Sequence, residues 1–483
     1  MKKVLLVSCL LFITIKAFSQ RFSQYNTGTL YDSFENPSQR SFIPDSSRQF
    51  ASNFFVPNFS GNVFLSGEGQ SALKSRIFTG IYNTTGLTTG NDRYNYLNAN
   101  GSDYILMLKV YTNPTGNREL GFFIKTNFEA KSIISNETLA LFGGSDKFAN
   151  NIYDDAFNDR YYSQVYHQIG VTFREQVTPR LALGVKFSLL SGVDFQKYSI
   201  FNSQLSLDKP NNMATFSLSG IKYTGGLGNT STIVQGMGLA FTNPGASISL
   251  GATYKNEDAY NFQFNIKDLG FIHWSNKISK VSYFSRDTAQ ISMSPTFASE
   301  NTVSDKLSTI TGGNEVNRGF YFPINGLAEV SVNKDYWLDY ERSVKFSPTV
   351  IISKELFYQG LTGALVAPVQ YEKYVVTLSS YYNDLKMFGV GGQFMIKTPN
   401  SEFFIGSDAL YQSVRFAKDA IQGSNYVTPA VPGRYSGTSF FIGFSLKFGN
   451  LIESPMDASY VPNGEKGFLG RLYEKIFKKD KNY

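Results

Sequence analysis

The chain has 483 residues, of which 16% are aromatic and only 17% are charged. Soluble domains usually carry about 25% charged residues, and disordered chains combine high charge with few rings, so this composition excludes disorder. After residue 15 no unbroken apolar run approaches the ~20 residues that a spanning helix needs, which excludes a helical membrane protein. What remains is an all-β chain, either a secreted sandwich or a membrane barrel.

The N-terminus has the features of an export signal. Two lysines precede an apolar run from Val4 to Ile15, and Ala17-Phe18-Ser19 places small residues at the two positions that a signal peptidase reads. We therefore predict a cleaved signal peptide over residues 1–19. The only cysteine, Cys9, would leave with it, so the mature chain would contain no disulfide. The signal also carries three of the lysines behind the net charge of +7, and nucleic acid is not expected as a partner.

The next segment, residues 20–46, lacks alternation and is rich in Ser, Asn and Phe. We interpret it as a plug or hatch that enters the barrel. The alternative is a periplasmic strap that stays outside the lumen.

From residue 47 to residue 449, about ten segments alternate between apolar and polar residues. Between Thr438 and Phe448, for example, Phe440, Ile442 and Phe444 alternate with small or polar residues such as Gly443 and Ser445. A period of two places alternate side chains on opposite faces of a strand. These segments run nine to twelve residues, close to what a tilted strand needs to cross a bilayer, whereas sandwich strands are usually shorter. A single transmembrane antiparallel barrel is therefore favoured over the sandwich.

The connections between these segments fall into two classes. Four are short and contain turn residues, at 113–117, 177–179, 256–258 and 398–401, whereas four are long and polar, at 129–163, 191–213, 268–325 and 411–435. Outer-membrane barrels combine short periplasmic turns with long outer loops. The pattern therefore predicts an outer-membrane location as well as a barrel.

The tail, residues 450–483, ends in a basic amphipathic helix. Phe468, Leu472 and Ile476 share one helical face. The positive charge near this face comes from Arg471, Lys475, Lys478 and Lys479. Such a helix could lie on the inner leaflet of the outer membrane, dock on a periplasmic partner, or remain in solvent.

Residues with catalytic or metal-binding chemistry are scarce. His167 and His273 have no Ser, Asp or Glu at a spacing typical of a triad, and both are interpreted as structural. An oxygen-rich patch, formed by Asn151, Asp154, Asp155, Asn158 and Asp159, fits no EF-hand spacing. We predict no enzyme activity, no cofactor and no metal site.

Several short motifs resemble a known group of barrels. The stretch Asp268-Leu269-Gly270-Phe271-Ile272-His273-Trp274 resembles a signature of a Bacteroidota outer-membrane barrel family of unknown function. The opening, with Glu35-Asn36-Pro37-Ser38, is similar to PorP/SprF proteins of type IX secretion and gliding, although Ser38 replaces their alanine. The wider resemblance is to FadL-like and PorV-like barrels. It implies about 14 strands, within a range of 12 to 16, and an N-terminal segment folded into the lumen.

Two functions remain in view. The first is a non-enzymatic accessory barrel in a secretion, surface-attachment or gliding assembly, which would bind periplasmic or outer-membrane proteins. The second is a FadL-like transporter of a hydrophobic or amphipathic small molecule. Both place the protein among outer-membrane lipid. The polar inward faces favour the first hypothesis, since a transporter of apolar solutes would need an apolar lumen pocket.

Overall fold

The computed structural model describes residues 22–43, 46–90, 93–112, 116–226, 241–292, 300–312, 314–358, 360–422, 435–453 and 467–477. The predicted signal peptide lies outside these residues. Among the helices of the described residues, none combines the length and apolar character required to cross a membrane.

The wall is a closed barrel of 14 antiparallel strands, in which β1 and β2 together occupy one position. Each strand pairs with the next along the chain, and β22 closes the ring on β1 and β2. The wall strands, in order, are β1 (Arg48–Ser52), β2 (Asn58–Ser66), β3 (Tyr94–Tyr111), β4 (Arg118–Ser135), β6 (Arg160–Thr178), β7 (Leu181–Asp208), β9 (Pro244–Lys255), β10 (Tyr260–Trp274), β14 (Leu327–Lys334), β17 (Thr349–Glu355), β18 (Leu361–Tyr371), β19 (Tyr374–Asn383), β20 (Phe388–Lys397), β21 (Ser401–Ser407) and β22 (Ser436–Leu451).

The predicted alternation is confirmed, and its apolar face points outward. On β10, Phe262 and Phe264 are exposed on the outside, whereas Gln263 and Asn265 are buried in the lumen. A sandwich would have packed the apolar faces together. Here they form an exposed apolar belt, which is stable only against lipid, and ring closure leaves no open strand edge there.

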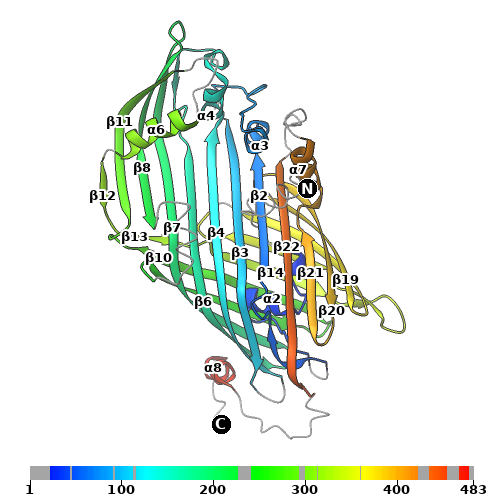
Figure 1. The fold of residues 1–483 in the computed structure, drawn as a ribbon. Helices are drawn as coiled ribbons and strands as arrows, with labels where there is room; N and C mark the ends of the chain where they lie inside the picture. Colours follow the sequence, from blue (N-terminus) through cyan, green and yellow to red (C-terminus); the bar gives the residue numbers. More distant parts are fainter. Residues whose placement is uncertain are drawn as a thin grey trace.

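The two ends of the barrel differ as the connections predicted (Figure 1). The short turns lie at the lower end, where the hairpin of β15 (Tyr336–Trp337) and β16 (Val344–Phe346) is also found. The upper end carries α3 (Gln70–Thr79), α4 (Asn136–Ala140), α6 (Glu300–Gly312) and α7 (Leu410–Gln422). We refer to these ends as the short-turn end and the helical end.

The prediction of a loop over 191–213 is wrong. β7 continues to Asp208, pairs there with β8 (Met213–Gly226), and β8 pairs with β11 (Lys280–Ser292). Alternation continues above the lipid belt but is inverted there, because Leu205 and Leu207 are buried on the inner face whereas Gln204 and Ser206 are exposed on the outer face. Smaller elements complete this part, namely β5 (Ile152–Asp154), β12 (Glu315–Asn317), β13 (Phe320–Pro323), η2 (Leu141–Gly143) and η3 (Ser145–Lys147).

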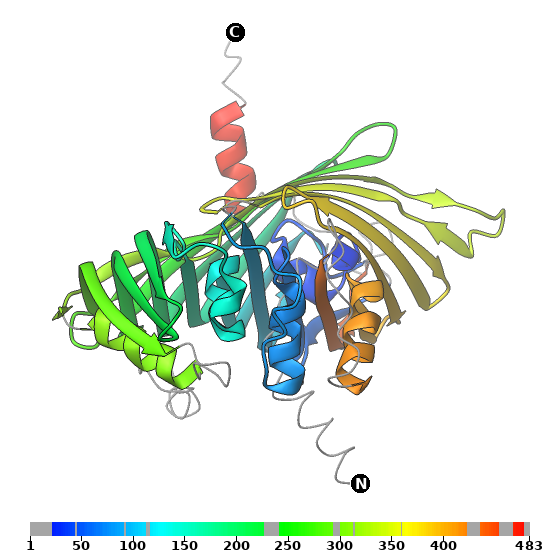
Figure 2. The same cartoon turned by 90° about the horizontal axis from the view of Figure 1, so that it is seen from above.

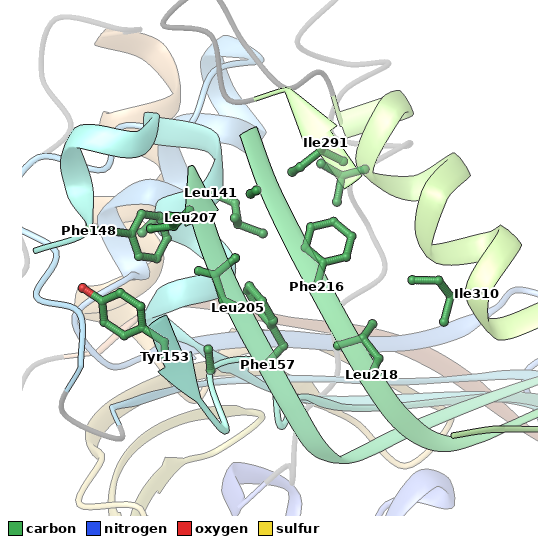
Figure 3. Packing of buried hydrophobic residues seen from close by; sticks show 14 of the residues in the cluster. Leu141, Phe148, Tyr153, Phe157, Leu205, Leu207, Phe216, Leu218, Ile291 and Ile310 are labelled. Carbon is green, nitrogen blue, oxygen red and sulfur yellow. The ribbon is translucent and has the colours of Figure 1, made fainter. Parts of the chain in front are cut away.

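This extension of the sheet has a hydrophobic core of its own (Figure 3). Leu205 and Phe216 from the strands pack between two sets of residues, Leu141 to Phe157 on one side and Ile310 of α6 on the other. The opposite face of the extension carries polar residues such as Gln204, so it faces water rather than lipid. We call this unit the outer layer.

Candidate functional site

The N-terminal segment, residues 22–43, lies inside the barrel (Figure 2). It contains η1 (Phe22–Gln24) and α2 (Leu30–Glu35), and Thr29 caps α2 by accepting a hydrogen bond from the Asp32 amide. Aromatic side chains of α2 pack on the wall, with ring centroids 5.5 Å apart for Phe34 and Phe123. We call residues 22–43 the plug.

Ion pairs and a hydrogen bond connect the plug to three strands of the wall. Glu35 contacts Lys125 of β4 at 3.0 Å and Lys267 of β10 at 3.6 Å. Lys267 also pairs with Glu329 of β14 at 2.8 Å, and Tyr25 of the plug donates its hydroxyl to Glu329.

A second group of charges lies nearer the short-turn end. Glu119 is fully buried and lies 3.5 Å from Lys109 and 3.6 Å from Arg174. The same carboxylate accepts hydrogen bonds from the amide and hydroxyl of Ser41, while Lys109 and Arg174 donate to plug carbonyls. Sequence analysis did not single out these residues. Their signal was a charged residue at an inward position of each of three neighbouring alternating strands, β3, β4 and β6.

Asn36 and Pro37, which carry part of the family resemblance, lie where the plug packs against glycines of the wall. Asn36 donates to Gln263 at 3.2 Å and accepts from Ser38. Glycines face both residues, and a side chain at Gly184 would place its first carbon 2.0 Å from the carbonyl oxygen of Pro37. The wall is therefore shaped to receive the plug backbone.

Gly184→Ala is expected to displace the plug without preventing barrel formation. The new methyl group would meet plug backbone rather than a flexible side chain, and such overpacking costs about 1–3 kcal/mol. Thermal unfolding and solute permeability of the reconstituted barrel measure the effect. Gly363→Ala is the matched control, because an added carbon there meets no atom within 4 Å. Equal unfolding temperature and permeability of the two variants would contradict the close contact between Gly184 and the plug backbone.

The Asp268–Trp274 motif forms part of β10, so its assignment to a loop is wrong. The register shifts between Ile266 and Leu269, and Asp268 adopts a φ of 48°. This bulge turns the Asp268 carboxylate into the lumen, where it lies 3.1 Å from Lys186 and accepts from Gln168 at 2.8 Å. A bulge re-aims a side chain in this way.

The other residues of the motif have different structural roles. Leu269 and Phe271 are exposed on the outer surface, whereas Trp274 is fully buried beside Phe195. Gly270 must be small, because an added carbon would lie 2.4 Å from the Ala246 carbonyl oxygen. The motif thus maintains the wall, and Asp268 supplies its carboxylate to the lumen.

A cavity of about 180 Å³ lies between the plug and the helical end. Its polar lining includes Asn62, Asn100 and Ser102 of the wall and Glu35 of the plug. Its apolar lining includes Phe22 of the plug with Phe64, Tyr381 and Met387, which belong to one hydrophobic cluster. The lining can therefore contact both parts of an amphipathic molecule.

The hydrophobic cluster of Phe22 also contains Ala409 and Tyr435, which lie beside a seam in the wall. β21 ends at Ser407, while its neighbours β20 and β22 continue toward the helical end, and α7 occupies the space between them. The Gln412 amide donates to the Phe388 carbonyl, and the Ser413 hydroxyl accepts from the Ser439 amide at 2.9 Å. Side chains of a helix thus satisfy strand edges that a longer β21 would have paired.

The described tail residues lie outside the barrel, on the opposite side of the wall from the plug. α8 (Phe468–Phe477) is found at the short-turn end, with Phe468, Leu472, Ile476, Arg471 and Lys475 all exposed. Lys478 and Lys479 lie outside the described residues.

The oxygen-rich patch has structural contacts. Asp159 accepts hydrogen bonds from Ser135 and Thr138 at the start of α4, and burial raises its pKa to about 6 although these bonds lower it. Asp154 accepts from Gln204. Within the described ranges, no group of three or more His, Cys, Asp or Glu is placed to hold a metal ion.

A closed ring of 14 strands, an exposed apolar belt and a plugged lumen define a membrane-spanning barrel of the outer-membrane type. The chain belongs to DUF5723, a family of unknown function, whose family model matches residues 48–408.

Other comparisons find only distant likenesses. No curated protein matches the chain. Among solved structures, the Ralstonia pickettii toluene transporter TbuX is 10% identical, with a TM-score of 0.44 over 87% of this chain and 94% of that one. A Pseudomonas aeruginosa FadL homologue is 10% identical, with a TM-score of 0.42 over 88% and 96%. The P. putida toluene transporter TodX is 9% identical, with a TM-score of 0.38 over 86% and 93%. The strand pairing described above, and not these likenesses, carries the assignment of the fold.

Proposed function

We propose that this protein moves a small amphipathic molecule across the outer membrane and that the plug is its gate. The single observation that carries the proposal is the cavity, which is lined by the plug and by both polar and apolar residues of the wall. A molecule held there could pass only if the plug shifted. In this proposal the chain is exported by the signal at 1–19 and the short-turn end faces the periplasm.

The contacts of the plug support a gating role. Side-chain contacts and packing hold it, and the only cysteine of the chain is Cys9. The 180 Å³ cavity is smaller than the ~300 Å³ at which ordinary ligand pockets begin, so a bound solute would have to displace part of the plug. The α7 seam offers a second element that could move, since side-chain contacts replace the strand pairing there.

The outer layer favours a second candidate function, the binding of a protein partner in a secretion, surface-attachment or gliding assembly. The ring of wall strands closes without β8, β11 and α6, yet these elements build a separate hydrophobic core beyond the lipid belt. A rigid unit in that position could present a binding surface.

Purification from native outer membranes in mild detergent distinguishes the two functions. Mass spectrometry of the proteins and small molecules that accompany the barrel is the measurement. Transport predicts a defined amphipathic molecule and no stoichiometric protein. A stoichiometric protein partner with an empty barrel would contradict it and favour the assembly role.

A further inference from the structure

The start of α8 is fixed to the outer surface of the barrel at the short-turn end. The Leu469 amide donates to the Glu175 carboxylate at 2.9 Å, and Glu175 is the register partner of Arg118 on the neighbouring strand. Gly467 allows this approach, because an added carbon would lie 2.3 Å from the same carboxylate. A carboxylate at the start of a helix also complements the helix dipole.

From this attachment the helix projects sideways. Figure 1 shows α8 end-on below the strands, and Figure 2, turned by 90°, shows it side-on and extending past them. Its axis therefore crosses the direction of the front strands of the wall instead of continuing it. For a barrel that spans a membrane, such a helix runs along the membrane surface.

Along the strands, α8 is attached close to the edge of the lipid belt. Leu120 and Phe122 follow Arg118 by two and four residues on β4, and both are exposed on the outer surface. At about 3.3 Å per residue, the first lipid-facing side chain is about 7 Å from the attachment point. Amphipathic helices bury their apolar faces at about this depth, 5–10 Å into the boundary between headgroups and acyl chains.

The side chains of α8 suit that position. Phe468, Leu472 and Ile476 are 65%, 43% and 59% exposed and share one face. Arg471 and Lys475 are exposed as well, and neither makes an ion pair with a described residue. An apolar stripe beside cations complements a surface of acyl chains and anionic headgroups.

We propose that α8 binds the anionic lipid surface of the membrane leaflet at the short-turn end and so anchors the tail beside the barrel. This inference rests on the membrane-spanning wall and is independent of transport. The occupant is lipid, because the helix that carries the exposed stripe is attached at the edge of the belt that faces lipid and the cations match its headgroups.

The test uses the full-length protein in vesicles of phosphatidylethanolamine and phosphatidylglycerol that contain spin-labelled lipid near the headgroups. A fluorophore is attached at Leu472→Cys, and in a separate variant at Glu474→Cys, which lies about 200° around the helix. We expect blue-shifted emission and strong quenching at position 472, with several-fold weaker quenching at position 474. When Arg471→Glu and Lys475→Glu are added to the Leu472→Cys variant, quenching at position 472 should fall to the level measured at position 474. Heat-modifiable gel mobility verifies that each barrel is folded.

Three results would overturn the proposal. Equal quenching at the two positions would show that α8 does not present its apolar face to lipid. No quenching at either position would show that α8 stays in solvent. Protection of position 472 only after addition of periplasmic protein would identify a protein as the occupant.

Discussion

Deletion of residues 20–45 is expected to turn a closed barrel into an open channel. The plug fills the lumen, and the inward wall positions that it leaves, such as Asn265 and Lys267, are polar and would be hydrated. Wide barrels with polar interiors conduct water and ions. Ion current across a planar bilayer is the measurement, with little current through the full-length protein and a steady conductance after the deletion.

A matched control uses the other end of the chain. Deletion after Gly464 removes α8 but no lumen contact of the plug, so this variant should remain closed. If the plug deletion also remains closed while its gel mobility shows a folded barrel, another element closes the lumen. The gating role of the plug would then be wrong.

Glu119→Ala is expected to be the most destabilising of the point substitutions considered. It leaves Lys109 and Arg174 buried without their carboxylate, and removal of one partner from a buried ion pair costs about 3–5 kcal/mol. It also removes the acceptor of Ser41, which ties the plug to β4. Glu119→Gln retains a hydrogen-bond acceptor and should therefore lose less stability than Glu119→Ala. Unfolding in urea from detergent or vesicles measures both variants.

An exposed ion pair serves as the control for this substitution. Arg180 and Glu257 lie 2.9 Å apart at the short-turn end, where both side chains are more than half exposed. Exposed pairs contribute little because water and salt screen them. The Glu257→Ala variant should therefore unfold at the same urea concentration as the wild type. A similar loss of stability in the Glu119→Ala and Glu257→Ala variants would show that burial does not increase the contribution of the Glu119 cluster to stability.

The barrel and the direction of its faces could be predicted from sequence because lipid imposes a period of two on each wall strand. The same reasoning failed above the belt, where water lies on the outer face and the outward residues of β7 and β8 are polar while the inward ones are apolar. It also placed the Asp268–Trp274 motif in a loop, because a bulge at Asp268 breaks the period within β10.

The candidate site was predictable only in part. The lack of alternation in the N-terminal segment indicated a plug, but the partners of Glu35 come from β4 and β10, which only the closed ring brings together. The match between Pro37 and Gly184 likewise depends on register across the wall. Spacing along one chain carries no such information.

The position of the plug can be measured directly with two cysteines. The hydroxyl oxygens of Ser23 in the plug and Ser379 in β19 lie 3.2 Å apart, close enough for a disulfide after Ser23→Cys and Ser379→Cys. The double variant, in intact outer membranes, is denatured without reductant and treated with a thiol-reactive label. A plug inside the closed barrel predicts no labelling until a reductant is added, whereas each single variant labels at once. Free labelling of the double variant without reductant would contradict the placement of the N-terminal segment in the lumen.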